Sequence, residues 1–268
     1  MTSLCLLPRF CLAHLYWFCL LPGLGMSHLV SAQTLIKLCY EDATYFPWQI
    51  KNGHGLDNNL VEMAAQKIGV KVEMLAIPWK RCMTEVGYDT QAGGFAASYN
   101  LERASFAVYP MRDGKPDPGR RMRYDSYSLY RLKGSSASWD GKQLSQLSGP
   151  VGVQLGYSIA VDLRKLGADV DESHINPELQ LRKLLAGRVQ LVALLTLDGD
   201  KLLEQPGFAQ KVERINPALV ERPYFLIFNK EYYARNSKLV NDMWDALAQV
   251  RESEQFKTLR QKRIKAGQ

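Results

Sequence analysis

Hydrophobic positions near the start of the chain follow two periods, one typical of strands and one typical of helices. Leu35–Tyr40 is a short apolar run and residues 70–74 alternate between apolar and polar side chains, so both are predicted strands. Between them, apolar residues recur at helical spacing over Leu60–Ile68, with Asp57 as the expected helix cap and Gly69 as its end. A strand, a helix and a second strand in this order are typical of an α/β layer on a parallel sheet.

The same alternation continues after an irregular stretch and again after a short linker. The stretch over residues 112–123 is rich in Gly, Pro and Arg, and residues 133–136 are the linker. The patterns predict helices at 78–86, at 157–166, from Pro177 with Asn176 as cap, and twice after Phe228; they predict strands at 93–97, 124–132, 151–155, 191–197 and 223–228. In the first C-terminal helix, Met243 and Trp244 are expected in the core.

Residues 1–32 are predicted to be a cleavable secretion signal. Arg9 is the only charged residue before an apolar stretch that includes Leu15–Leu24, and Val30-Ser31-Ala32 is a small-x-small cleavage site. The alternative is a membrane anchor, but Pro22 interrupts the apolar stretch, which is too short for a spanning helix. We therefore expect an exported, periplasmic mature protein that begins at the next residue.

Composition excludes several classes of function. The 268 residues carry a net charge of +7 with a pI near 9.1, and 46% of them are hydrophobic, which supports a full core. The sequence has no zinc-ligand spacing, no glycine-rich phosphate loop and no repeat of basic and aromatic residues. We therefore expect no metal, no other cofactor and no binding of nucleic acid.

Removal of the signal would leave two cysteines, Cys39 and Cys82. In an oxidising compartment two cysteines are a candidate disulfide. Cys39 lies in the first predicted strand and Cys82 lies in the helix after the second, and those elements should be neighbours. Two unpaired, partly buried thiols are the alternative.

The segment with the clearest chemical content reads GGFAASYNLERASFAVYP, residues 93–110. Small side chains at the end of its strand would let a ligand approach the backbone closely. Ser98 and Arg103 follow, and a guanidinium can hold both oxygens of a carboxylate at once. The alternative is that Arg103 is a solvated surface residue, as most arginines are.

This segment resembles the one by which bacterial extracellular solute-binding proteins of family 3, the polar amino-acid receptors, hold the α-carboxylate of their ligand. In that family it usually reads like G-x-S/T-x-T-x-E-R, and Ser98 and Arg103 occupy its two main polar positions. The order of the predicted elements also resembles the whole mature chain of the family. The resemblance implies an α/β, two-lobed periplasmic-binding-protein-like fold of type II, whose lobes close around the ligand.

The resemblance implies a division of the chain as well. Lobe 1 would comprise residues 33–130 plus 222–268, and lobe 2 would be inserted between them as residues 134–218. The hinge strands would cross near 130–133 and 219–225. Ligand would bind between the lobes, at the carboxyl ends of strands where helix N-termini point their N–H groups.

Further ligand-binding residues are implied by the same family. The loop after its first strand commonly ends in Tyr-x-Pro-aromatic, so Tyr45 and Trp48 are expected to form an aromatic wall against the ligand; covering the loop is the alternative. At the start of a helix in lobe 2, Ser158 is expected to close on the ligand carboxylate. Tyr157 stands where the family has a small hydroxyl residue, which narrows the cleft and adds a donor at longer reach.

The chain departs from the family at the acid that pairs with the ligand's α-ammonium. Leu195 occupies that position, and Gln190 replaces another acid upstream. Asp198 and Asp200 follow shortly and are the alternatives. We expect the ammonium contact to be weak or absent, because an unpaired ammonium in a closed cleft costs several kcal/mol. That favours a carboxylate without an α-amine, or a modified or larger amino-acid derivative.

These features favour a monomeric periplasmic solute-binding protein that captures a small carboxylate-bearing solute, an amino acid or a derivative, for an ABC-type permease. We expect no catalysis. One alternative is an enzyme on the same scaffold, similar to cyclohexadienyl dehydratase, for which Glu41 and Asp42 are the only acids to consider. The other is a ligand sensor for a membrane partner, which needs the same closing cleft.

Overall fold

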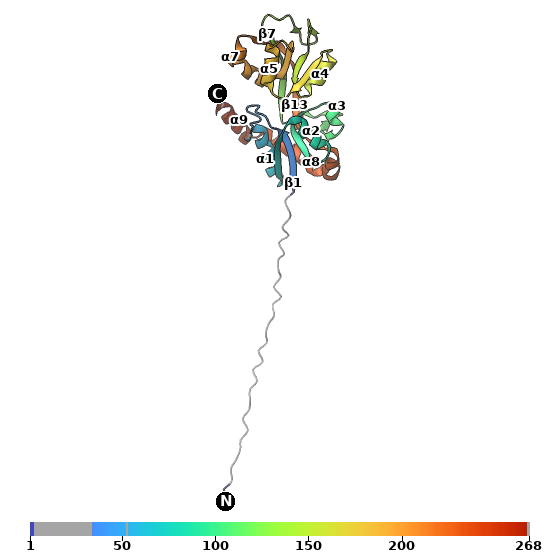
Figure 1. The fold of residues 1–268 in the computed structure, drawn as a ribbon. Helices are drawn as coiled ribbons and strands as arrows, with labels where there is room; N and C mark the ends of the chain where they lie inside the picture. The colour runs from blue at the N-terminus through green and yellow to red at the C-terminus, as the bar shows by residue number, and fades with distance from the viewer. Residues whose placement is uncertain (3–33, 52, 267–268) are drawn as a thin grey trace. The chain divides into compact units, whose positions relative to one another are not determined.

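A mixed nine-stranded sheet runs through the protein in this computed structural model, which describes residues 1–2, 34–51 and 53–266 (Figure 1). The strands of the sheet are β1 (Leu35–Glu41), β2 (Lys71–Ile77), β3 (Gly93–Ser98), β4 (Ala107–Val108), β7 (Arg123–Leu132), β10 (Val151–Gln154), β11 (Val170–His174), β12 (Leu191–Leu195) and β13 (Val212–Asn229). They lie in the order β11-β10-β12-β7-β13-β3-β1-β2, with β4 paired to β13. The predicted secretion signal lies outside the described residues, apart from its first two.

The described helices pack on the sheet, and two of them end the chain. They are α1 (Leu56–Lys67), α2 (Trp79–Gly87), α3 (Leu101–Ala104), α4 (Ile159–Lys165), α5 (Pro177–Leu185), α6 (Thr196–Leu203), α7 (Pro206–Ala209), α8 (Lys230–Glu252) and α9 (Glu254–Ala266). Two small hairpins, β5 (Met111–Arg112) with β6 (Lys115–Pro116) and β8 (Ser138–Trp139) with β9 (Leu144–Ser145), and a 3-10 turn at Pro118–Arg120 fill the connections. None of the described helices is long and apolar enough to cross a membrane.

Most predicted elements are confirmed, and their differences have local causes. The apolar run 191–197 ends as a strand at Leu195, and Leu197 is an exposed residue of α6. Strand β11 was not predicted, since its polar sequence VDESH lies at an edge of the sheet. The cap of α1 is Gly55 rather than Asp57, whose carboxylate turns inward to an arginine.

The sheet has two halves, each with its own helices and core. In the first half β1 pairs in parallel with β2 and β3, and its buried core includes α1 and α8 with Met243 and Trp244, as predicted. In the second half β10 pairs in parallel with β11 and β12, and α4 and α5 pack on it. The antiparallel strands β7 and β13 run through both halves. This arrangement is two α/β layers joined by two strands.

Strand register indicates where the two strands pass between the halves. On β7, residues Tyr127–Tyr130 pair with β12, while Arg123–Tyr127 pair with β13. On β13, pairing with β3 begins at Tyr224. The hinge positions 130–133 and 219–225 stay predictions. The exact boundaries of the lobes stay a prediction.

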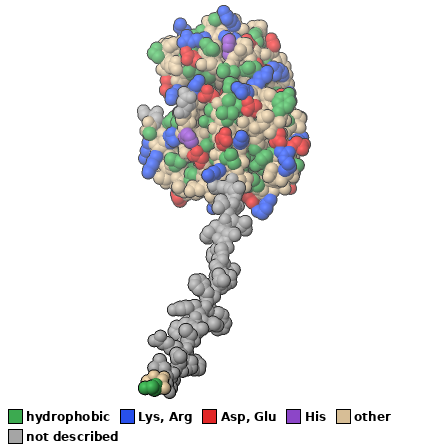
Figure 2. All heavy atoms as spheres, turned by 60° about the horizontal axis from the view of Figure 1, so that its bottom comes forward, with side chains coloured by type: hydrophobic (Ala, Val, Ile, Leu, Met, Phe, Trp, Pro, Cys, Tyr) green, Lys and Arg blue, Asp and Glu red, His purple; other side chains and the backbone are tan. Residues whose placement is uncertain are grey.

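Charge is mixed on the surface despite the net charge of +7. In Figure 2, Lys and Arg side chains alternate with Asp and Glu side chains over the visible face, without one large patch of a single sign. Exposed ion pairs also occur on the described surface, such as Arg182 with Glu178 at a separation of one helical turn. Each such pair adds little stability.

A disulfide joins Cys39 of β1 to Cys82 of α2, with an S–S distance of 2.07 Å and a Cα–Cα distance of 5.6 Å. Both cysteines are fully buried. The bond fixes α2 against the sheet, next to Trp79 and Phe225 in the same core cluster. It therefore holds one wall of the space between the halves.

We predict that loss of this disulfide lowers the free energy of unfolding by about 2–4 kcal/mol, because it closes a loop of 43 residues in the unfolded chain. Urea unfolding with and without reductant measures the difference. The matched control is the double variant Cys39→Ala/Cys82→Ala, which should be equally stable in both conditions. A wild-type curve that reductant leaves unchanged would contradict the prediction.

Candidate functional site

A cavity lies between the two halves of the sheet and encloses about 560 Å³ of empty space, part of it open to solvent. Residues of both halves line it, including the predicted Tyr45, Ser98, Arg103, Tyr157 and Ser158. Further lining residues that carry polar or aromatic groups are Glu41, Thr44, Gln49, Trp79, Arg123, Tyr127, Gln154, Asp198 and Tyr224. The carboxyl end of β1, the end of β3 and the turn after β10 all contribute to it.

Arg103 is held at the centre of this site and is not a solvated surface residue. Only 5% of it is exposed, and its guanidinium lies over the Trp79 ring at 5.1 Å from the ring centre. Nη1 donates to the Ser98 carbonyl at 2.9 Å, and Nη2 donates to the Gly156 carbonyl at 3.0 Å. Asn100 caps the short helix α3 and accepts from the Arg103 N–H. The local turn thus aims the guanidinium across the cleft.

Among the described residues, three hydrogen bonds join the two halves across the cleft. The hydroxyls of Ser98 and Ser158 lie 2.6 Å apart, and the Tyr157 hydroxyl donates to Glu41 Oε2 at 2.6 Å. The bond from Arg103 to Gly156 is the third. The cleft between the two halves is therefore closed in this structure, with hydrogen bonds from polar side chains of one half to the other half.

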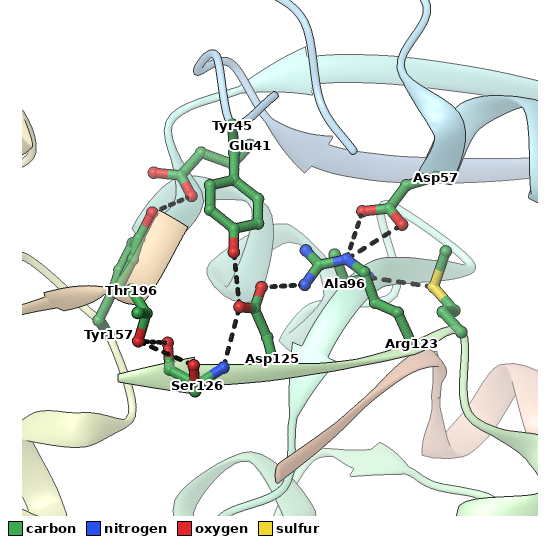
Figure 3. A network of polar contacts seen from close by, with 10 residues as sticks. Glu41, Tyr45, Asp57, Ala96, Arg123, Asp125, Ser126, Tyr157 and Thr196 are labelled. Atoms are coloured by element: carbon green, nitrogen blue, oxygen red, sulfur yellow. Dashed lines mark hydrogen bonds and ion pairs between the residues drawn. The ribbon is translucent and has the colours of Figure 1, made fainter. Parts of the chain in front are cut away.

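A buried ionic network around Arg123 adjoins the cavity, which Arg123 and Tyr45 also line. Figure 3 shows its side chains. Arg123, at the start of β7, donates from Nε to both oxygens of Asp57 at 3.3 Å and pairs through Nη1 with Asp125. The Tyr45 hydroxyl donates to the other oxygen of Asp125 at 2.5 Å. Three rings stack on the Arg123 guanidinium, those of Tyr45, Trp48 and Tyr224. This network fixes Tyr45 against the cavity.

Trp48 does not join the aromatic wall that the sequence predicted. Its ring packs on the Arg123 guanidinium and lines a separate surface hollow together with Arg121 and Phe256. The Trp48 ring packs on Arg123 because a guanidinium over an aromatic face is a favourable contact. Only Tyr45 of the predicted pair reaches the cavity.

Of the two aspartates considered as ammonium acceptors, Asp198 lines the cavity and Asp200 does not. Asp200 accepts from the Tyr130 hydroxyl at 3.0 Å and pairs with Arg214 at 2.5 Å. Helix α6 packs this closely on Tyr130 because Gly199 has no side chain; a Cβ there would lie 2.2 Å from Tyr130 Cζ. That packing directs Asp198 toward the cavity.

The cavity holds two carboxyl groups whose charge is poorly compensated. Burial, together with the nearby carboxylates of Asp125 and Glu41, raises the pKa of Asp198 to about 8. The Asp198 carboxylate makes no hydrogen bond or ion pair with any described residue. Burial also raises the pKa of Glu41 to about 7, against the opposing hydrogen bond from Tyr157. Both acids would be stabilised as anions by a cation in the cavity.

No family model matches the sequence, and no curated protein matches it. Solved structures do. One is a histidine kinase sensor domain with similarity to periplasmic binding proteins, at 15% identity and a TM-score of 0.69, over 87% of this chain and 96% of that one. A second is an ancestral arginine-binding protein bound to arginine, at 20% identity and a TM-score of 0.65, over 86% and 98%.

A third similar structure is an ancestral amino-acid-binding protein that is a precursor of cyclohexadienyl dehydratase, at 16% identity and a TM-score of 0.62, over 85% of this chain and 94% of that one. At such identities the likeness shows the fold alone. The chain has the fold of periplasmic amino-acid-binding proteins, and the predicted fold class is confirmed.

We predict that Arg123→Met destabilises the protein by about 3–5 kcal/mol, because it leaves Asp57 and Asp125 buried without a counterion. For a chain of this length that loss lowers the melting temperature by roughly 10 °C, which calorimetry detects. The variant Arg123→Met/Asp57→Asn/Asp125→Asn, without the orphaned charges, should recover part of the loss. A single variant as stable as wild type would show that the network contributes nothing.

Proposed function

We propose that the protein is a solute-binding protein that captures a small molecule carrying both a carboxylate and a cationic group, such as an amino acid or a derivative, in the cavity between its halves. The observation that carries the proposal is that Arg103, a buried cation, and Asp198, a half-buried acid from the opposite half, line the same cavity. The predicted secretion signal and the fold favour an exported protein that serves an ABC-type permease.

The carboxylate end of such a ligand would bind at Arg103. In the closed shape this guanidinium donates to two backbone carbonyls, which are neutral acceptors. A carboxylate would be a stronger acceptor, since hydrogen bonds between charged partners are about twice as strong as neutral ones. The adjacent hydroxyls of Ser98 and Ser158 add donors beside it.

The cationic end would bind at Asp198. A buried carboxyl group without a hydrogen bond either stays protonated or gains a cation. An ammonium group would let Asp198 ionise. This proposal takes up the alternative that the sequence left open. Gln190 and Leu195 stand where the family has acids, so a weak ammonium contact was expected; Leu195 does line the cavity, and Asp198 lines it as well.

A ligand sensor is the second candidate, because the chain is similar to the sensor domain of a histidine kinase over most of its length. A sensor and a transporter feeder would use the same cavity. An enzyme is a third candidate, favoured by the Glu41 carboxyl group with its pKa near 7 in the cavity and by the similarity to a dehydratase precursor. Turnover of a prephenate-like substrate that disappears in Glu41→Gln would favour the enzyme.

A thermal-shift screen of the refolded protein against amino acids, amino-acid derivatives and simple carboxylic acids tests the proposal. A ligand at one hundred times its dissociation constant stabilises by about 2.7 kcal/mol, or roughly 5–10 °C for this chain length. We expect a shift with at least one amino acid or derivative. Silence across the panel would contradict the proposal.

Arg103→Ala should abolish that shift, because the carboxylate loses its charged partner. Arg103→Lys is the matched control; it keeps the charge without the planar fork and should retain weak binding. The melting temperature of each variant without ligand reports whether its fold is intact. A full shift in Arg103→Ala would rule out this residue as the carboxylate partner.

Asp198→Asn should weaken the binding of any ligand with an ammonium group by about 10- to 100-fold, since a charged hydrogen bond contributes about 1.5–3 kcal/mol. Titration calorimetry measures the change. Asp200→Asn is the matched control, because Asp200 bonds to Tyr130 and Arg214 outside the cavity. Equal losses in both variants would contradict the assignment of Asp198.

A further inference from the structure

We propose that Glu41 and Tyr157 form a proton-coupled latch that closes the cleft without a ligand. The latch goes beyond the proposed function, because it concerns how the two halves close whatever they bind. Glu41 ends β1 in the first half, and Tyr157 precedes α4 in the second half. Their hydrogen bond of 2.6 Å therefore joins the two halves across the cleft (Figure 3).

The position of Tyr157 gives this bond leverage on closure. Its ring packs edge-on against Tyr127 of β7, with 6.4 Å between ring centres, so the phenol is fixed from its own half. Tyr157 also lines a second, outer groove between α2 and α4, and thus stands between that groove and the inner cavity. If the halves separate, the bond to Glu41 breaks and the inner cavity joins the outer groove.

Closure of the cleft also shields two acidic side chains from water. Glu41 comes from the first half and Asp198 from the second, and in the closed shape each raises the electrostatic cost of ionising the other. The charged and titratable groups that act on Glu41 are Tyr157, Arg103, Asp42 and Asp198. Those that act on Asp198 are Asp125, Glu41, Arg123, Lys201, Tyr45, Tyr130 and Tyr157. Both acids have a raised pKa, so the nearby cations do not compensate for the loss of contact with water.

The direction of the coupling follows from these shifts. In an open cleft both acids would face water and titrate near their ordinary pKa values of 4.5 and 3.8. In the closed cleft the pKa values are about 7 and about 8, so closing takes up protons. Closure is therefore favoured fully below the open-state values, and this advantage is lost as the pH rises through 7 and 8. Glu41 alone changes the closing equilibrium on the order of 100-fold.

The experiment measures opening directly, without ligand. Spin labels on Thr84→Cys of α2 and Arg164→Cys of α4 would lie on opposite rims of the outer groove, where both residues are exposed. Cys39 and Cys82 are joined in the disulfide and would not take the label. The labelled protein begins at Gln33, so that Cys5, Cys11 and Cys19 of the predicted signal are not part of it. We expect a short distance at about pH 5.5 and a longer one at about pH 9, with the closed-to-open ratio changing at least tenfold.

Variants separate the hydrogen bond from the charge. Tyr157→Phe keeps the ring and loses the bond, so the cleft should be more open than in wild type at both pH values. Glu41→Gln/Asp198→Asn keeps an acceptor for Tyr157 and removes both titrating groups, so the cleft should be closed at both. Tyr232→Phe on α8 is the matched control and should behave as wild type, because the Tyr232 hydroxyl makes no hydrogen bond with any described residue.

Two results would overturn the proposal. A wild-type distance that is the same at both pH values would remove the coupling to protons. A Tyr157→Phe variant that closes as wild type does at low pH would remove the latch. Neither result bears on whether Arg103 and Asp198 bind a solute, which the ligand screen decides separately.

Discussion

The antiparallel pairing of β7 with β13 is the constraint on which the rest of the structure depends. These two strands alone run through both halves of the described sheet, and the cavity lies where they cross between the halves. Arg123 stands at that crossing, paired with Asp57 of the first half and with Asp125 two residues along its own strand. Three aromatic rings shield the guanidinium, so the charge is buried but fully partnered. The ion pairs of Arg123 therefore fix the two strands where residues of both halves line the cavity.

Three charged or titratable groups that line the cavity have no charged partner. Arg103 bonds to carbonyls, Glu41 bonds to a phenol, and Asp198 bonds to no described residue. Each of these groups prefers a charged partner, and a molecule with one carboxylate and one cationic group would supply both kinds. Without such a molecule, Glu41 and Asp198 take up protons when the cleft closes. Ligand capture and proton uptake are thus two ways to meet the same requirement.

The sequence predicts those features that depend on neighbours along the chain. Ser98 and Arg103 lie five residues apart in one segment, and the apolar run 191–197 favours a buried strand, which the structure has up to Leu195, so both were recognisable. Arg123 was missed because its partner Asp57 lies 66 residues away and only the fold brings them together. The same arginine determines which way Trp48 turns. Whether Asp198 or Asp200 faces the cavity depends on how Gly199 packs on Tyr130, which no local pattern reveals.

The most direct test of the account compares three ligands rather than three proteins. Titration calorimetry would measure the affinity of an amino acid found in the screen, of the same molecule without its amine, and of the same molecule without its carboxylate. Pairing with Arg103 at one end and Asp198 at the other predicts that only the complete amino acid binds tightly, with each truncated molecule about 10- to 100-fold weaker. A deaminated acid that binds as tightly as the amino acid would contradict the role of Asp198 and with it the central claim.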